Sequence, residues 1–256
     1  MASKQNTPGT GLTLCDNASG QTAPADQIIA DLKKELEFTR KKLQIVGSVT
    51  RHDVLNQLTA IIGFNELLRM MVQDPKLKNY VEKEKLAIDQ IQRQFRYAKD
   101  FQNIAVDPPR WQNLRNLASI VSEDCELHGA RIVVDTGDAA ILADPLLEKV
   151  FQYLFENAFC HGGKATEIRI SLVMTGPEGL LLVENNGTGI CGEEKSRIFE
   201  RGFGSGTGWG LFIAREILAV TGMTITETGD PEHGMRFEIT LPPGTLELNV
   251  GEPASS

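Results

Sequence analysis

The sequence lacks the features that would tie the chain to a membrane, to nucleic acid or to a disulfide framework. No stretch approaches the roughly 18 apolar residues of a membrane-spanning helix, and the N-terminus lacks the charged-then-apolar order of a signal peptide. The net charge of -8 supplies no basic field for nucleic acid or an anionic membrane. The four cysteines form no Cys-x-x-Cys pair, which indicates neither a zinc site nor disulfides. We expect a cytoplasmic protein that neither binds nucleic acid nor inserts into a membrane.

The chain is long enough for two modest domains, and its composition favours a real core. It has 256 residues, of which 41% are hydrophobic, so it should fold without disulfides. Residues 1–24 are rich in small and polar residues without an apolar period, which predicts a flexible tail. Residues 245–256 are predicted to form a C-terminal tail.

Residues 25–107 have the pattern of two long helices that need a partner. Apolar residues alternate spacings of three and four in two runs, which is typical of coiled-coil seams. The first run contains Ile29, Leu32, Leu36, Leu43 and Val46, with Thr39 at one position of the seam, and the second contains Leu77, Val81, Ile88, Ile91, Phe95 and Ala98, with Glu84 at one position. Asp74-Pro75 separates the runs, which predicts an antiparallel hairpin. Because one hairpin leaves its apolar stripe half covered, we expect a homodimer that closes into a four-helix bundle.

Residues 108–244 have a mixed α/β pattern. Asp107-Pro108-Pro109 stops the second helix and predicts a domain boundary near residue 108. The predicted helices are 114–127, a helix that starts at 144–145 and reaches 161, and 211–220. The predicted strands are 131–135, 168–174 with 180–184 as a hairpin, and 224–228 with 235–241 as a second hairpin, and 140–142 is a further short apolar run.

The first predicted helix carries a small polar patch within 51–58. His52 and Asp53 place an imidazole beside a carboxylate, and Asn56 follows one helical turn later on the same face. The patch can therefore combine a nucleophile, a base and an amide that positions a water. On these residues alone, a plain surface histidine on an amphipathic helix is the more common interpretation.

Three polar or glycine-rich segments lie in the second half of the chain. The first is 156–161 on a helix, where the amide oxygen of Asn157 is the kind of hard ligand that Mg²⁺ prefers. The second is 184–190 at a strand end. The third is 202–211, whose backbone N–H groups lead into a helix and suit phosphate oxygens. Taken singly, each element is more often a turn, a cap or a packing residue.

Together, these elements resemble the sensor histidine kinases and their ATP-binding domain, which belongs to the superfamily of gyrase, Hsp90, histidine kinase and MutL. Asn157 resembles the N box, 185–190 the first glycine box, 198–200 with Phe203 the F box, and 206–211 the second glycine box. The His52 patch lies where that family has its H box. The resemblance covers about 25–243. It implies an α+β fold, with a dimeric helical hairpin followed by a two-layer α/β sandwich.

The resemblance implies that ATP and Mg²⁺ bind to the second domain, with Asn157 on the metal. His52 would attack the γ-phosphoryl group while Asp53 orients or accepts the ring proton. The phosphoryl group would then pass to an aspartate on a separate receiver domain, and Asn56 would position a water for a phosphatase reaction. An upstream sensor domain or partner is expected but unidentified. The implied nucleotide contacts are Asn157, His161, Asn185, Gly187, Gly189, Ile190, Phe203, Gly206, Thr207, Gly208, Gly210 and Leu211.

Three positions depart from the family pattern, of which Thr188, in place of a common proline, should matter less than the other two. Asn185 stands where the family usually has an aspartate that accepts a hydrogen bond from adenine, and Tyr153 stands where the N box usually has another asparagine. These departures favour an alternative, in which a catalytically weak relative serves as a dimeric phosphotransfer or binding module. An ATPase clamp of the same superfamily is disfavoured because such a protein needs no His-Asp patch on a helical hairpin.

Overall fold

The computed structural model describes residues 22–126, 130–161, 165–204 and 208–248, and the side chains of 25–121, 130–159, 165–204 and 208–248. The chain divides into two compact units, 1–50 and 51–256, each considered by itself. The tail predicted at 1–24 lies outside the described residues except for 22–24, which already belong to the first helix.

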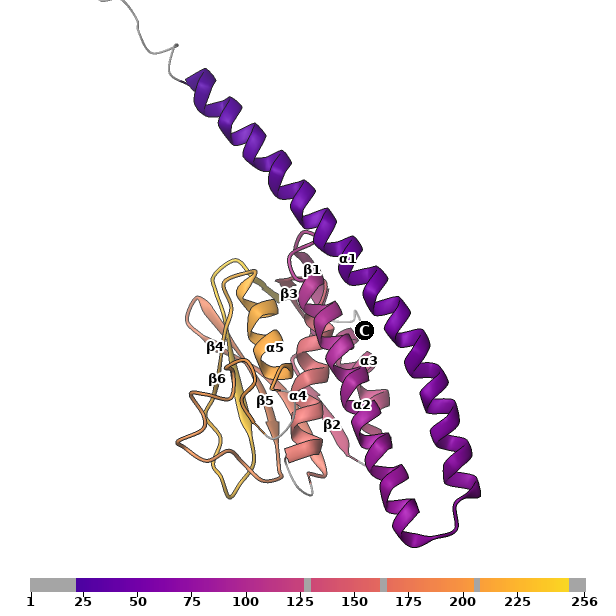
Figure 1. Cartoon of the computed structure of the whole chain (residues 1–256). Helices are drawn as coiled ribbons and strands as arrows, with labels where there is room; N and C mark the ends of the chain where they lie inside the picture. The colour runs from indigo at the N-terminus through magenta and orange to yellow at the C-terminus, as the bar shows by residue number, and fades with distance from the viewer. Residues whose placement is uncertain (1–21, 127–129, 162–164, 205–207, 249–256) are drawn as a thin grey trace, which may run out of the picture. The chain divides into compact units, whose positions relative to one another are not determined.

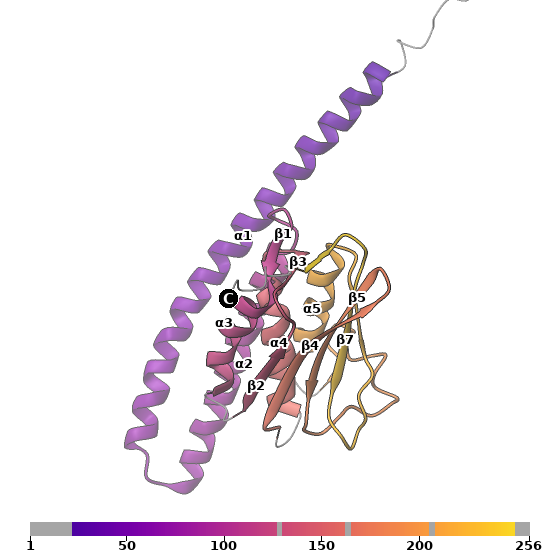
Figure 2. The ribbon, with the colours of Figure 1, turned by 180° about the vertical axis from the view of Figure 1, so that it is seen from behind.

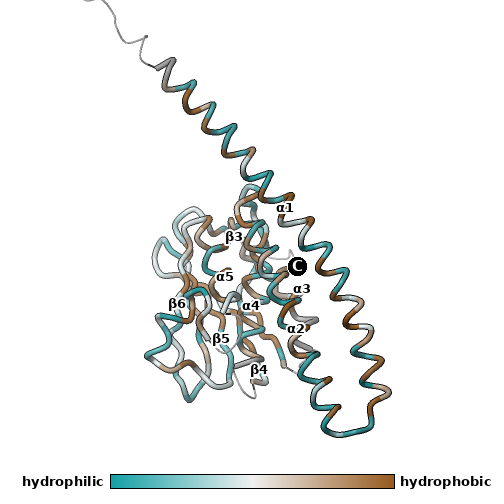
Figure 3. Tube along the Cα trace, in the orientation of Figure 1, coloured by the Kyte–Doolittle hydropathy of each residue, from teal (hydrophilic) through white to brown (hydrophobic). Residues whose placement is uncertain are grey.

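Helix α1 runs from Thr22 to Met71 and carries the first predicted seam. In the unit 1–50, Leu32, Leu36 and Leu43 are 60 to 69% exposed, so the seam has no cover within one chain. Figure 3 shows apolar residues recurring along this helix between polar ones. Among the described residues, no helix combines the length and apolar character needed to cross a bilayer.

Helix α2 runs from Pro75 to Asn103 and forms the predicted antiparallel hairpin with the end of α1 (Figure 1). Asp74 caps α2, because its carboxylate accepts hydrogen bonds from the N–H groups of Lys76 and Leu77 at 2.8 and 3.1 Å. Arg51 Nη1 donates to Gln102 Oε1 at 3.0 Å near the other end of the hairpin. The predicted helical hairpin is therefore confirmed.

A five-stranded sheet with three helices on one face forms the α/β layer pair (Figures 1 and 2). Its strand order is β2-β4-β5-β7-β6, with β2 parallel to β4 and the other pairs antiparallel. The strands are β2 (Arg131–Asp135), β4 (Glu167–Thr175), β5 (Glu178–Asn185), β6 (Thr224–Glu227) and β7 (Arg236–Leu241). The helices are α3 (Leu114–Glu126), α4 (Leu147–His161) and α5 (Gly210–Ala219). This arrangement confirms the predicted fold class and both β-hairpins.

A second, three-stranded sheet was only partly predicted. It has the order β1-β3-β8, with β1 (Arg110–Asn113), β3 (Ala139–Ala143) and β8 (Leu246–Leu248) all antiparallel. Strand β8 lies where the sequence predicted a C-terminal tail, and β1 lies where it predicted a linker. Both strands are too short to show a period, and each pairs with β3 far away in the sequence. The local pattern therefore contains no signal for either of them.

The core lies between the five-stranded sheet and its helices. Strand β7 alternates in burial, so that Phe237, Ile239 and Leu241 face the helices and are at most 2% exposed. Phe151 and Leu154 of α4 and Ile213 of α5 fill the opposite side. This packing fixes the two helix ends and the strand ends that carry the predicted functional residues.

Candidate functional site

His52, Asp53 and Asn56 lie together on the surface of α1, as the sequence predicts. His52 Nδ1 is 3.2 Å from Asp53 Oδ1, and the amide nitrogen of Asn56 is 3.3 Å from His52 Nδ1 and 3.5 Å from Nε2. The side chains of His52 and Asp53 are 73 and 69% exposed, whereas Leu58, one to two turns further on, is buried and anchors the helix. A partner protein can therefore reach the imidazole directly.

The contact with Asp53 favours one tautomer of the His52 ring. A carboxylate accepts hydrogen bonds, so it favours the tautomer in which Nδ1 carries the proton and donates it to Asp53. In that tautomer Nε2 keeps its lone pair, and the nearby Asn56 amide can approach it only as a donor. In that tautomer Nε2 is the ring nitrogen with a free lone pair.

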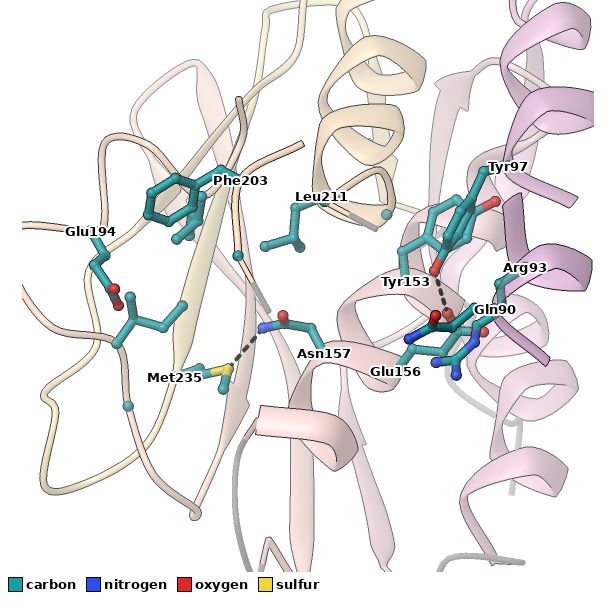
Figure 4. A pocket seen from close by; sticks show the side chains of 16 residues that line it. Gln90, Arg93, Tyr97, Tyr153, Glu156, Asn157, Glu194, Phe203, Leu211 and Met235 are labelled. Atoms are coloured by element: carbon teal, nitrogen blue, oxygen red, sulfur yellow. Dashed lines mark hydrogen bonds between the residues drawn. The ribbon is translucent and has the colours of Figure 1, made fainter. Parts of the chain in front are cut away.

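A cavity of about 570 Å³ lies beside the C-terminal half of α4 and the first residues of α5. Its volume is within the 300–1,000 Å³ that is typical of small-molecule sites. One end is mostly apolar, with Phe203 and Met235 and the single carboxylate of Glu194, the other end is polar, and Asn157 lies between them (Figure 4). The lining residues are Gln90, Arg93, Tyr97, Tyr153, Glu156, Asn157, Gly189, Ile190, Glu194, Ile198, Phe203, Gly204, Gly208, Gly210, Leu211 and Met235.

Asn157 presents its amide at the middle of this cavity. Its Nδ2 donates to the sulfur of Met235 at 3.0 Å, which leaves Oδ1 as the acceptor atom (Figure 4). A single amide oxygen beside a polyphosphate suits Mg²⁺, which is commonly held by one or two protein oxygens together with phosphate oxygens and waters. Among the described residues, no group of three His, Cys, Asp or Glu side chains offers an all-protein metal site. The single oxygen of Asn157 therefore fits a Mg²⁺ ion that is bound together with the phosphates of a nucleotide.

Asn185 has a structural role in this arrangement. Its Oδ1 accepts hydrogen bonds from the backbone N–H groups of Gly187 at 2.9 Å and Met235 at 3.2 Å. The side chain thereby joins the end of β5 to the start of β7. Asn185 does not line the large cavity but a small neighbouring one of about 10 Å³. Its amide oxygen is therefore already occupied by backbone donors.

Two glycines allow the backbone at the edge of the cavity to pack closely. A Cβ on Gly189 would lie 2.2 Å from the carbonyl oxygen of Asp230, and Gly189 N–H donates to the carbonyl of Pro231 at 3.0 Å. Gly208 has φ of +65°, and a Cβ there would lie 2.4 Å from the carbonyl carbon of Gly202. Any other residue at either position would displace the loops that border the cavity.

Helix α2 closes the polar end of the cavity through two tyrosines. The Tyr153 hydroxyl donates to Asp100 Oδ2, and the Tyr97 hydroxyl donates to Glu156 Oε2 at 3.3 Å. The two rings pack with centroids 5.3 Å apart. Burial and the neighbouring Glu156 raise the pKa of Tyr97 to about 12, and burial followed by the Asp100 contact raises the pKa of Tyr153. Both phenols therefore remain neutral donors at physiological pH.

An aromatic cluster holds the end of α2 against the start of α5. Phe101 contacts Trp209 and Phe212 with ring centroids 6.1 and 5.7 Å apart. The Arg201 guanidinium lies 4.5 Å from the centre of the Trp209 ring. Trp209 thus packs between α2, α5 and the preceding loop.

Comparisons with known proteins agree with this geometry. Residues 143–245 match the family described as histidine kinase-, DNA gyrase B- and HSP90-like ATPase. The alginate biosynthesis sensor protein KinB of Pseudomonas aeruginosa is 25% identical over 244 residues, which cover 87% of this chain and 40% of that protein. The signal transduction histidine-protein kinase AtoS of Escherichia coli (strain K12) is 28% identical over 251 residues, covering 88% and 40%. Over most of its length the chain is therefore similar to sensor histidine kinases, and residues 143–245 match their ATPase family.

The chain spans about two fifths of the length of those curated relatives. Its fold is also that of a solved structure described as full-length ShkA in complex with AMPPNP. The TM-score is 0.56 at 20% identity, and the match covers 78% of this chain and 46% of that one. AMPPNP is a ligand of that protein, and the similarity between the two chains is one of fold.

The structure brings most of the predicted nucleotide contacts to one cavity. Those that line it are Asn157, Gly189, Ile190, Phe203, Gly208, Gly210 and Leu211. Asn185 and Gly187 lie beside it, whereas Gly206, Thr207 and the side chain of His161 lie outside the described residues. Sequence reasoning missed Gln90, Arg93 and Tyr97, because residues of a coiled-coil helix carry no local signal for facing another domain.

Proposed function

We propose that this chain is an ATP-dependent protein-histidine kinase that phosphorylates His52. The observation that carries the proposal is the cavity, whose apolar end, central Asn157 and glycine backbone suit a purine followed by phosphates. The exposed His52–Asp53 pair in the same chain supplies an acceptor for the phosphoryl group.

Asp53 prepares His52 for the transfer. By accepting the Nδ1 proton, the carboxylate holds the lone pair of Nε2 outward and stabilises the positive charge that the ring acquires. His52 Nε2 then forms a bond to the γ-phosphorus, while the bond from that phosphorus to the bridging oxygen breaks and ADP leaves with that oxygen. The product is a phosphohistidine on an exposed helix.

Asn157 and the glycine loops would hold the nucleotide. Ile190, Ile198 and Met235 form an apolar surface for the base, and Asn157 Oδ1 would bind Mg²⁺. The metal supplies positive charge that offsets the charge on the phosphates. Gly208 precedes helix α5 and Gly210 begins it, and the positive end of this helix would attract the phosphates.

A receiver domain on another protein would take the phosphoryl group from His52. Its aspartate oxygen would bond to phosphorus as the bond to Nε2 breaks, and the imidazole would recover its lone pair. As a second reaction, Asn56 would position a water that hydrolyses the phosphorylated receiver, since its amide lies beside the ring. Phosphate release from a phosphorylated receiver should then fall with Asn56→Ala.

Dimerisation follows from the exposed seam of α1. Ile29, Leu32 and Leu36 are 49 to 69% exposed in one chain and repeat with coiled-coil spacing. A second copy of the chain would cover them and build the four-helix bundle in the cytoplasm, where the dispersed cysteines remain reduced. The input would reach α1 from an upstream sensor domain or partner.

The second candidate function is a binding or phosphotransfer module with little kinase activity. Asn185 favours it, because the side chain lacks the charge of the usual aspartate and its oxygen is occupied by backbone N–H groups. Tyr153 favours it as well, because its hydroxyl is directed to Asp100 of α2.

Incubation with γ-labelled ATP and Mg²⁺ separates the two functions. A kinase should acquire acid-labile, alkali-stable label that His52→Gln abolishes. His233→Gln is a matched control, because His233 is also exposed and also lies beside an aspartate, at 3.3 Å. Absence of label together with absence of nucleotide binding would favour the module, and restored labelling in Asn185→Asp would identify the defect.

A further inference from the structure

The polar end of the cavity is built partly by helix α2, which belongs to the phosphoacceptor hairpin. Gln90, Arg93 and Tyr97 of α2 line it opposite Glu156 of α4. Figure 4 shows these four side chains at one end, Phe203 and Met235 toward the other, and Asn157 between them. A nucleotide with its base at the apolar end would extend its phosphates past Asn157 toward α2.

Among the described residues, the polar end of the cavity has a paired carboxylate and an unpaired guanidinium, which favours binding of an anion. Glu156 is already paired, because Arg96 Nη2 lies 3.0 Å from its carboxylate and the Tyr97 hydroxyl donates to it. Arg93 is the only cation among the described lining residues, and within the described part of the chain no carboxylate lies within ion-pair distance of it. A half-buried guanidinium without a counter-ion favours binding of an anionic group, and phosphate oxygens match its fork of donors.

We infer that Arg93 binds the terminal phosphates of the nucleoside triphosphate, so that the phosphoacceptor hairpin completes the nucleotide site. This inference rests on the proposed function and adds a residue from outside the ATP-binding domain. It assigns the β- and γ-phosphates to the end of the cavity formed by α2.

The hairpin register indicates that this contact belongs to a resting arrangement. Arg51 is hydrogen-bonded to Gln102, so His52 lies at the level of Gln102 on α2. Arg93 precedes Gln102 by nine residues, which is about 13 Å along the helix at 1.5 Å per residue. Phosphates held by Arg93 are therefore displaced along the hairpin from the His52 ring, and the contact must break before transfer. Because the contact is made in the bound state and lost before the transition state, loss of Arg93 should raise KM for ATP and kcat together and leave kcat/KM nearly unchanged.

The test compares binding of ATP, ADP and AMP by the full chain, with Mg²⁺, in the original sequence and in Arg93→Gln. The variant should lose about tenfold in ATP affinity, as expected for one charge-assisted contact, and bind AMP unchanged. Arg93→Lys should recover part of the loss. Lys99→Gln, which removes the same charge from an exposed position of α2, should bind all three nucleotides normally.

Three results would overturn the inference in distinguishable ways. Equal ATP affinity in the original chain and Arg93→Gln would reject the role of Arg93 while leaving the kinase proposal intact. An equal loss for ATP and AMP, or a lowered melting temperature, would indicate a structural role instead. If the original chain binds no adenine nucleotide, the kinase proposal fails and the role of Arg93 fails with it.

Discussion

The buried hydrogen bond between Tyr153 and Asp100 should contribute measurably to stability. Tyr153 is 3% and Asp100 4% exposed, so the carboxylate has little access to water if the hydroxyl is removed. A hydrogen bond to a charged group contributes about 1.5–3 kcal/mol, and we expect Tyr153→Phe to lower the free energy of unfolding by ~2 kcal/mol. For a chain of this size that corresponds to a melting temperature lower by about 4–8 °C.

Tyr97→Phe is the matched control for this substitution. It removes the same atom from a neighbouring ring, but its partner Glu156 is 37% exposed and keeps its ion pair with Arg96 at 3.0 Å. We expect a loss below about 1 kcal/mol, because water and Arg96 still satisfy the carboxylate. Urea denaturation followed by circular dichroism measures both losses. Equal losses in the two variants, or less than about 0.5 kcal/mol for Tyr153→Phe, would refute the reasoning.

Gly189→Ala should lower the free energy of unfolding by about 1–3 kcal/mol, because its Cβ would lie 2.2 Å from the Asp230 carbonyl oxygen. Gly63→Ala, with nothing within 4 Å of its Cβ, should raise the free energy of unfolding by up to ~1 kcal/mol. Thermal denaturation compares the two variants. Leu36→Asp should convert dimer to monomer in sedimentation experiments, because it places a charge in the exposed seam; an unchanged mass would exclude this seam as the interface. The raised pKa of Tyr97, about 12 against an ordinary 10.0, favours the neutral phenol in the folded chain. The contribution of this shift to the free energy of unfolding should be complete below pH 10 and lost between pH 10 and 12. If the free energy of unfolding of Tyr97→Phe falls equally over this pH range, the prediction is wrong.

The sequence predicted elements best where a local period or a strong turn signal exists. The α1–α2 hairpin follows from the coiled-coil spacing and from Asp74-Pro75, and the β4–β5 hairpin follows from 175–179. Strands β1 and β8 were missed, because three or four residues show no period and their pairing with β3 is non-local. The helix bounds agreed to within a few residues, since helix ends depend on capping contacts as well as on pattern.

The sequence alone indicated the family resemblance, the polar patch and seven of the residues that line the cavity, which are Asn157, Gly189, Ile190, Phe203, Gly208, Gly210 and Leu211. These depend on fixed spacings along a helix or around a loop, which the chain encodes locally. Only the tertiary structure decided that Asn185 satisfies backbone donors, that Tyr153 is directed to Asp100, and that Arg93 faces the phosphate end of the cavity. Each of these contacts joins residues far apart in the sequence, and its partners are set by the packing of whole elements against one another.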